Sequence, residues 1–197
     1  MKVYIIRHGE SECNRQNMNC GWSQTPLSPL GREQAAAAAK YLAGIRFDKV
    51  FCSDLNRARE TCALALPGYE PVLTDKIREI SVGCISEHYY EDNLREYGET
   101  YTESVINQDF RAFGGESKEQ MAARVADFIR EVEAQDGQCE RIAVVGHEGT
   151  VHQFFNHAMG YPVLLEHLSI ANASVTVFDY SGGRWSLVAF SYRGALE

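Results

Sequence analysis

The chain begins with a short apolar run that ends at a charged turn. Residues 2–6 read Lys-Val-Tyr-Ile-Ile, and Arg7, His8, Gly9 and Glu10 follow directly. β-Branched and aromatic residues bounded by a glycine are typical of a buried strand, which places Arg7 and His8 at its carboxyl end. Ligands bind at that edge of open α/β sheets, and a cation beside an imidazole favours the neutral, nucleophilic ring. The alternative is a strand end whose polar residues simply reach solvent.

The composition is ordinary for a soluble globular protein. With 197 residues, 45% of them hydrophobic, the chain is long enough for one domain, with or without an inserted subdomain. The formal net charge is −8 and no Lys/Arg cluster stands out, so we expect neither nucleic acid nor a membrane as partner. No signal peptide or membrane span is recognisable. Six cysteines without a Cys-x-x-Cys pair favour free thiols in a reducing cytoplasm over a zinc site.

Strand-like and helix-like segments alternate along the chain, which predicts an α/β layered domain. The expected strands lie at residues 2–6, 47–52, 71–74 and 141–146, and a terminal hairpin joins 175–178 to 187–190. The segment at 141–146 is almost entirely apolar and is therefore expected to be central.

Capping residues predict where the helices begin. Ser28 followed by Pro29 predicts a helix through Leu42, and Ser53 is expected to cap the next one. The capping box Ser-Lys-Glu-Gln at 117–120 opens a third helix.

Two stretches lack a periodic pattern. Residues 11–28 are expected to form a polar loop, and residues 81–116 permit no clean assignment.

Polar residues at three strand-to-helix junctions form one candidate site. His147 follows the fourth strand segment and precedes a helix, as His8 follows the first strand. Arg57 falls in the first turn of a helix, where the helix dipole disfavours a cation unless the arginine holds an anion. A solvated surface arginine is the alternative. Together with Arg7, these residues would form a cationic cup for one phosphoryl group.

The motifs resemble those of the histidine phosphatase superfamily, the phosphoglycerate mutase-like family, over most of the chain. They are Arg7-His8-Gly9-Glu10-Ser11 with Asn14, Ser53 to Thr61, Arg78-Glu79 with Gly83, Gly114 to Ser117, and Val145 to Gly149. Five motifs in this order make a chance resemblance negligible. The resemblance implies a three-layer α/β/α sandwich on a mostly parallel sheet, with residues 1–197 as one domain and 81–116 as a lid over the site.

The resemblance also implies phosphoryl transfer that needs no metal or cofactor. His8 would attack phosphorus and carry a phosphohistidine, with the nonbridging oxygens held by Arg7, Asn14, Arg57 and His147. Glu79 would protonate the leaving alkoxide, although a surface carboxylate paired with Arg78 is the alternative.

Three further residues are expected to bind substrate: Cys20 and Gly21, through their backbone, and Glu148. His147 and His152 are five residues apart, about 140° round a helix, so they cannot share a metal. We expect the other histidines to be ordinary helix or loop residues; they are His88, His152, His157 and His167.

Phosphatases and mutases of this family share the same cup. Ile80-Ser81-Val82 stands where mutases carry Arg-His-Tyr, and it offers nothing to grip a second phosphate or carboxylate. We therefore predict a cytoplasmic phosphomonoesterase of small-molecule phosphate esters, of the histidine acid phosphatase type. The alternatives are mutase-type phosphoryl transfer and a non-catalytic phospholigand sensor, for which Glu79 would have no use as an acid. The oligomeric state stays open, with a homodimer as one option.

Overall fold

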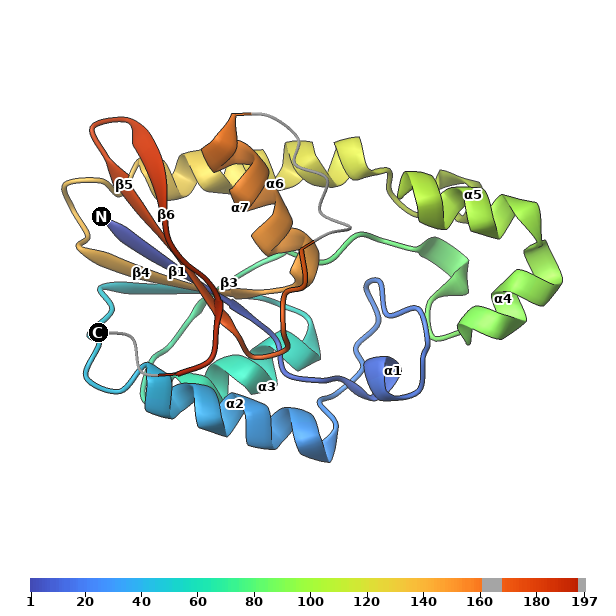
Figure 1. Ribbon diagram of the computed structural model, residues 1–197, viewed down its shortest axis with the longest axis horizontal. Coiled ribbons are helices and arrows are strands. Elements are labelled where there is room, and N and C mark those ends of the chain that lie inside the picture. Colours follow the sequence, from blue (N-terminus) through green and yellow to red (C-terminus); the bar gives the residue numbers. More distant parts are fainter. Residues whose placement is uncertain (161–167, 195–197) are drawn as a thin grey trace.

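The computed structural model describes residues 1–160 and 168–194. Its centre is a six-stranded sheet in the order β3-β2-β4-β1-β5-β6 (Figure 1). The strands are β1 Lys2–Arg7, β2 Lys49–Ser53, β3 Val72–Thr74, β4 Arg141–Gly146, β5 Val175–Ser181 and β6 Arg184–Tyr192. Neighbours from β3 to β1 pair in parallel, whereas β5 runs antiparallel to both β1 and β6. The predictions of an α/β class, a mostly parallel sheet and a terminal hairpin are confirmed.

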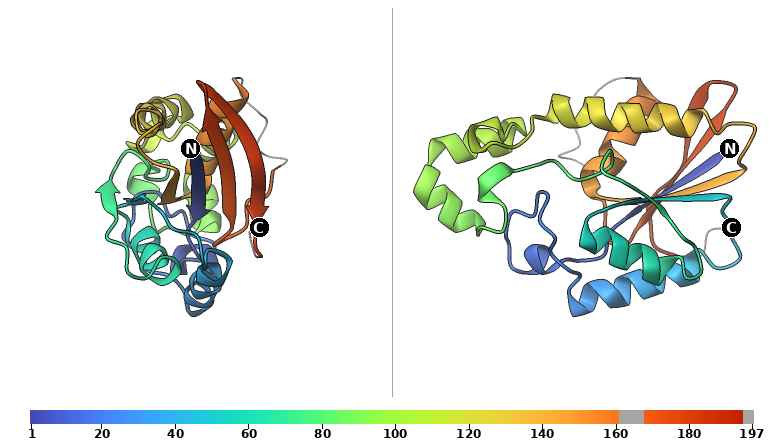
Figure 2. Two further views of the ribbon diagram at one scale, coloured as in Figure 1. Left: turned by 90° about the vertical axis from the view of Figure 1, so that its left-hand side faces the viewer. Right: turned by 180° about the vertical axis from the view of Figure 1, so that it is seen from behind.

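Helices cover both faces of the sheet, as Figures 1 and 2 show. One face carries α2 (Pro29–Tyr41) and α3 (Asn56–Ala65), and the other carries α6 (Lys118–Glu133) and α7 (Glu148–Met159). Val144 of β4 packs into the core below α6 and α7, and its neighbour Val145 packs into the core below α2 and α3. Because β4 is buried on both faces, its sequence reads as a continuous apolar run.

The prediction of a loop over residues 11–28 is wrong in part. A short helix, α1 (Glu12–Arg15), lies inside it, and a capping box closes its first turn: the side chains of Ser11 and Asn14 bond each other's backbone N–H groups. A helix of about one turn is too short to produce a hydrophobic period, which is why the sequence pattern missed it.

The expectation that Ser53 caps a helix is also wrong. Ser53 is the last residue of β2, and α3 begins at Asn56 with the apolar Leu55 at its N-cap. The Ser53 hydroxyl instead contacts the ring of His147.

Residues 81–116 form a helical extension beyond the carboxyl ends of the parallel strands (Figure 2, right). Its elements are η1 Gly83–Ile85, α4 Tyr90–Tyr97, α5 Glu99–Asn107 and η2 Arg111–Phe113. The extension has a small apolar core of its own, made of Val82, Ile85, Tyr101, Phe110 and Phe113. These elements are short and expose most of their residues, so they leave only a weak periodic signal.

Within residues 1–160 and 168–194, no helix is long and apolar enough to cross a bilayer.

Candidate active site

The two strand-end histidines lie side by side because β1 and β4 are neighbours in the sheet. Arg7 is in register with Gly146, and the His8 N–H donates to the Gly146 carbonyl at 2.9 Å. The rings of His8 and His147 are 5.2 Å apart between centroids and meet edge to face. Both residues are buried. The structure thus brings together two residues separated by more than half of the chain.

The hydrogen bonding of His8 determines which ring nitrogen is free. Its Nδ1 lies 2.6 Å from the carbonyl oxygen of Gly9. A carbonyl can only accept, so Nδ1 carries the hydrogen and Nε2 keeps its lone pair. Burial, followed by the charges of Arg57 and Arg7, holds the pKa of His8 well below its usual 6.5. His8 is therefore a neutral imidazole with a nucleophilic Nε2.

The turn after His8 is held by close backbone packing. A Cβ on Gly9 would lie 2.3 Å from the carbonyl oxygen of Gly31 in α2, so only glycine fits there. The Gly9 N–H donates to Thr61 Oγ1 at 3.0 Å, and Glu10 accepts a 2.6 Å bond from the Ser28 hydroxyl. These contacts bind the turn to α2 and α3 and so fix the direction in which His8 points.

Arg57 lies in the first turn of α3 and is fully buried. Its Nη1 and Nη2 donate to the carbonyls of Ser23 and Gly21 at 3.0 and 2.8 Å. Burial lowers its pKa from the usual 12.5. The alternative of a solvated surface arginine is therefore wrong, and two nitrogens of Arg57 hydrogen-bond to the backbone of the 21–23 loop.

Arg7 is held in a similar way by two partners. Its Nη1 donates to the Ile170 carbonyl, and its Nη2 lies 3.0 Å from Glu148 Oε2. Burial raises the pKa of the Glu148 carboxyl, although Arg7 acts in the opposite direction. Glu148 therefore contacts Arg7 directly.

His147 is oriented by a residue that the sequence did not reveal. Its Nε2 lies 2.9 Å from the hydroxyl of Ser53. That hydroxyl accepts a 3.5 Å bond from the Leu55 N–H, so its own hydrogen is free to bond Nε2. In that arrangement His147 Nδ1 carries the other hydrogen. Burial holds the pKa of His147 well below 6.5, with Arg57 and His8 as further causes.

Three nitrogen atoms around His8 are buried without a hydrogen-bond partner among the described residues. They are Arg7 Nε, Arg57 Nε and His147 Nδ1. An unsatisfied buried donor costs about 1–3 kcal/mol, more when it is charged. An anion accepting from these donors beside the His8 ring would remove that cost, so the arrangement suits a phosphoryl group.

Glu79 lies at the first turn of α7. Its Oε2 accepts from the Gly149 N–H at 3.2 Å, and its Oε1 accepts from the Ile80 N–H at 2.9 Å. A Cβ on Gly149 would lie 2.3 Å from Glu79 Oε1, so this glycine leaves space for the carboxylate. Arg78 instead forms an ion pair with Asp54. The alternative of an Arg78–Glu79 pair is therefore wrong.

The remaining predicted residues, Asn14, Cys20 and Gly21, belong to the segment 11–28. Asn14 Oδ1 caps α1, and its Nδ2 points to Cys20 Sγ at 3.8 Å. The carbonyl of Cys20 accepts from Ser86 Oγ at 2.8 Å. The Gly21 carbonyl accepts a hydrogen bond from Arg57 Nη2, so the backbone of Gly21 holds the Arg57 guanidinium in place.

Trp22 is a second residue whose contacts only the structure reveals. Its Nε1 donates to the Glu79 carbonyl at 2.7 Å. Its ring lies under the guanidinium groups of Arg78 and Arg124, at 4.8 and 5.7 Å. Trp22 thereby ties the 21–23 loop to the backbone of Glu79.

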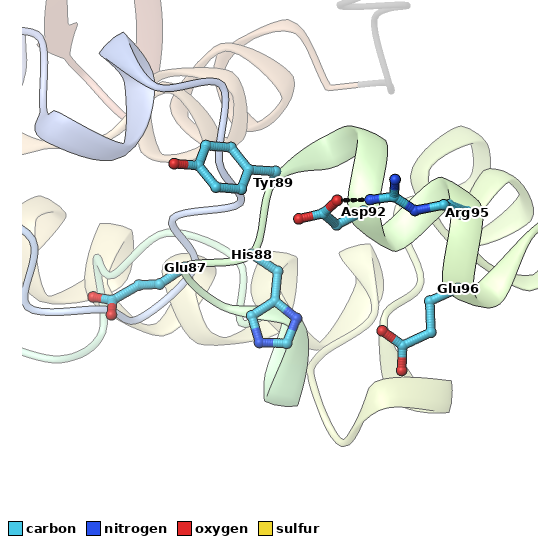
Figure 3. Close-up of a pocket in the computed structure, with 6 residues that line it drawn as sticks. All are labelled: Glu87, His88, Tyr89, Asp92, Arg95 and Glu96. Atoms are coloured by element: carbon cyan, nitrogen blue, oxygen red, sulfur yellow. Dashed lines mark hydrogen bonds and ion pairs between the residues drawn. The ribbon is translucent and has the colours of Figure 1, made fainter.

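One cavity lies on the extension, away from the cup. It has a volume of about 460 Å³ and is lined by Glu87, His88, Tyr89, Asp92, Arg95 and Glu96 (Figure 3). None of the predicted catalytic residues is in that lining, and its one arginine is paired with Asp92.

Among the described residues, the other histidines do not assemble a metal site. Across residues 1–160 and 168–194, no three His, Cys, Asp or Glu side chains are grouped to hold a metal ion. His157 lies at the surface beside Glu133, and His167 is outside the described residues.

The mostly parallel sheet and the donors around His8 define an α/β protein whose candidate site lies at the carboxyl ends of its parallel strands. A family model described as histidine phosphatase superfamily (branch 1) matches residues 3–193. The chain belongs to this superfamily, as the motifs indicated.

Two curated relatives and one solved structure are similar to the chain. A broad-specificity phosphatase of Saccharomyces cerevisiae is 31% identical, covering 91% of this chain and 80% of the relative. A Salmonella paratyphi A protein named "Probable phosphoglycerate mutase" is 27% identical, covering 94% and 87%. The crystal structure of an alpha-ribazole phosphatase from Shigella flexneri has a TM-score of 0.91 at 24% identity, covering 100% of this chain and 99% of that one. This last match confirms the fold.

Proposed function

We propose that this protein is a phosphomonoesterase, of the histidine acid phosphatase type, that hydrolyses small phosphorylated metabolites through a phosphohistidine on His8. The observation that carries the proposal is the 2.6 Å bond between His8 Nδ1 and the Gly9 carbonyl. This bond leaves a free lone pair on Nε2 of a ring that burial keeps neutral. A sensor would not need such a nucleophile.

The donors around His8 would bind the phosphoryl group during transfer. The transition state is loose and spreads its charge over the nonbridging oxygens, so positioned donors supply most of the rate enhancement. Arg7, Arg57 and His147 each have a buried nitrogen available for this purpose. Asn14 Nδ2, which lies 3.8 Å from the Cys20 thiol, is a fourth donor.

Glu79 would act first as acid and then as base. In the first step the His8 Nε2–P bond forms, the ester P–O bond breaks, and Glu79 gives its proton to the leaving alkoxide. In the second step Glu79 takes a proton from water, whose oxygen attacks phosphorus and releases His8 and phosphate. The Gly149 N–H holds the carboxylate in place for both steps.

The charges beside Glu79 favour hydrolysis over mutase chemistry. A mutase must bind a second anionic group of the substrate, but the nearby Arg78 and Arg124 are paired with Asp54 and Glu116. Residues 80–82 add no cation. We therefore place phosphatase activity first, with mutase activity, which the Salmonella relative's name suggests, as the alternative.

Within the single domain that we propose for residues 1–197, the helical extension at 81–116 would serve as a lid. Backbone contacts support this role, since the Tyr90 N–H donates to the Asn17 carbonyl at 3.1 Å and the Asn19 N–H donates to the His88 carbonyl at 3.0 Å, beside the loop that carries Cys20 and Gly21. The substrate class that we propose, small phosphate esters, agrees with the name of the yeast relative.

The test follows phosphate release and isomerisation together. The protein is incubated with p-nitrophenyl phosphate and, separately, with 3-phosphoglycerate, and acid-labile phosphate on the protein is trapped. We expect phosphate release and a trapped phosphohistidine, both absent in His8→Asn. Conversion of 3-phosphoglycerate to its 2-isomer faster than its hydrolysis would favour the mutase, and binding without turnover would favour the sensor.

Glu79→Gln tests the proton donor. We expect alkyl phosphates to slow by about 10²-fold or more, because their leaving groups need a proton. Phosphoenzyme formation from p-nitrophenyl phosphate should change little, since p-nitrophenolate leaves unaided. Equal losses on both substrates would exclude Glu79 as the acid.

A further inference from the structure

Glu79, the proposed proton donor, lies on a stretch of chain without regular structure. β3 ends at Thr74, and the next element, η1, begins at Gly83. His8 and His147, in contrast, directly follow strands of the sheet. A functional group on an irregular segment is positioned less precisely than one on a helix or strand unless other residues hold that segment. Contacts from the rest of the fold must therefore hold Glu79 in place.

The carbonyl oxygens of this stretch accept hydrogen bonds from side chains of other elements. Arg124 of α6 donates to four of them, through Nη1 and Nη2. These four carbonyls belong to Asp75, Lys76, Arg78 and Glu79, at 3.3, 3.0, 3.0 and 3.3 Å. The carbonyl of Ile77 accepts from the Thr150 hydroxyl of α7 at 3.0 Å. Every carbonyl from residue 75 to residue 79 thus has a side-chain donor from α6 or α7.

Glu116 holds the Arg124 guanidinium in a fixed orientation. Arg124 Nε donates to Glu116 Oε1 at 3.1 Å, and Nη2 donates to Oε2 at 2.8 Å. The two side chains are only 17% and 16% exposed, so solvent ions screen this pair little. Glu116 Oε2 also accepts from the Ser81 N–H at 3.0 Å. Arg124 and Glu116 together therefore bond the backbone on both sides of Glu79.

This set of bonds requires a guanidinium. Its five N–H donors lie in one plane and point in fixed directions, whereas the ammonium of lysine is a single nitrogen at the end of a flexible stem. Arg130, on the same helix, forms an ion pair with Asp127 and is 64% exposed. It therefore offers a matched surface position for comparison.

We propose that Arg124 is the positioning residue for the proton donor: it fixes the backbone of residues 75–79 and so keeps the Glu79 carboxyl against the first turn of α7, beside the Gly149 N–H. The inference rests on the proposed function, in which Glu79 protonates the leaving alkoxide. Arg124 acts through the backbone of this segment and not on the phosphoryl group. Because a displacement of about 1 Å at a reacting group can cost about 10²-fold in rate, loss of the Arg124 fork should slow the proton-dependent step by about 10- to 10²-fold.

The first experiment compares two substrates in Arg124→Lys. This variant keeps a positive charge beside Glu116 but lacks the fork of donors. Turnover of ethyl phosphate should fall by about 10- to 10²-fold, while phosphoenzyme formation from p-nitrophenyl phosphate should change little, since p-nitrophenolate leaves unaided. Arg130→Lys should match the wild type on both substrates. Equal losses on both substrates in Arg124→Lys would overturn the proposal.

A double variant shows whether Arg124 acts through Glu79. Once Glu79→Gln has removed the proton donor, adding Arg124→Lys should slow ethyl phosphate turnover by less than about twofold, because both changes remove the same function. A further loss as large as that of Arg124→Lys alone would place its role elsewhere and overturn the proposal. If circular dichroism shows that Arg124→Lys does not fold, Arg124→Gln combined with Glu116→Gln removes both charges of the pair and replaces it in each comparison.

Amide hydrogen exchange tests the positioning without catalysis. Gly149 is the second residue of α7, so its N–H has no acceptor inside the helix and is protected by the Glu79 carboxylate. Glu79→Ala gives the exchange rate of the unprotected N–H, and Arg124→Lys should raise the wild-type rate at least about threefold toward it. Faster exchange in a protein that hydrolyses no phosphate ester would support the positioning and refute the phosphatase. Exchange at the wild-type rate in Arg124→Lys would overturn the positioning, whatever the turnover.

Discussion

His8 and His147 occupy equivalent places in the fold and yet make different hydrogen bonds. Each is the first residue after a parallel strand, and the strands are direct neighbours in register. His8 gives the hydrogen on Nδ1 to a carbonyl, which leaves Nε2 as a nucleophile. His147 has its Nε2 against the Ser53 hydroxyl, and its Nδ1 is buried without a hydrogen-bond partner among the described residues.

The difference teaches that position at a strand end brings a histidine to the site but does not decide its chemistry. One bond from the neighbouring backbone or hydroxyl selects the ring nitrogen that faces the substrate. Four substitutions or conditions can separate the two roles, in order of decreasing effect.

Replacing His8 should have the largest effect. His8→Asn removes the only nitrogen that we assign as the phosphoryl acceptor, so turnover should fall by about 10⁴-fold or more and no phosphoenzyme should form. Rapid-quench trapping measures both. A phosphoenzyme at the wild-type level in this variant would contradict the assignment.

Replacing His147 should be less severe. His147→Asn removes one donor to the phosphoryl oxygens, so we expect kcat to fall by about 10²–10³ while phosphohistidine still forms. The surface variant His157→Asn serves as control and should retain wild-type turnover. If His147→Asn abolished the phosphoenzyme, the two histidines would not have separate roles.

Removing the Ser53 hydroxyl should weaken the orientation of His147 without removing it. Ser53→Ala loses one hydrogen bond of about 0.5–1.5 kcal/mol, which corresponds to roughly a tenfold effect or less. We expect this effect as a rise in the inhibition constant of inorganic phosphate and in KM, and the phosphoenzyme should still form. An effect as large as that of His147→Asn would mean that Ser53 contacts the phosphoryl group itself.

The free energy of unfolding should depend on pH through both histidines. Burial lowers their pKa values in the folded state, so below about pH 6.5 the unfolded chain binds more protons. Stability should therefore rise with pH up to about 6.5 and level off above it, each histidine adding up to about 1.4 kcal/mol per pH unit. Urea unfolding of the wild type and His8→Asn between pH 5 and 8 measures this slope, which the variant should reduce. An unchanged slope would mean that His8 is protonated in the folded protein.

Features whose sequence signal lies within a few neighbouring residues were predicted best. The helix after Ser28 and the capping box at 117 depend on bonds within one turn, and both are confirmed. We predicted that the cup residues lie together because they follow strand ends. This prediction holds because the carboxyl ends of parallel strands meet at one edge of the sheet. The sequence pattern predicted that Ser53 caps the helix that follows it, whereas in the structure its hydroxyl bonds His147, which is 94 positions away.

The sequence by itself determined the strands, the main helices and which polar residues reach the edge of the sheet, because hydrophobic periods, caps and motifs are local properties of the chain. Only the tertiary structure decided what each polar atom bonds. It directed Arg57 to the 21–23 loop and paired Arg78 with Asp54 instead of Glu79. Such choices depend on which buried groups meet across the fold, since a buried donor or acceptor must find its partner wherever the packing brings one.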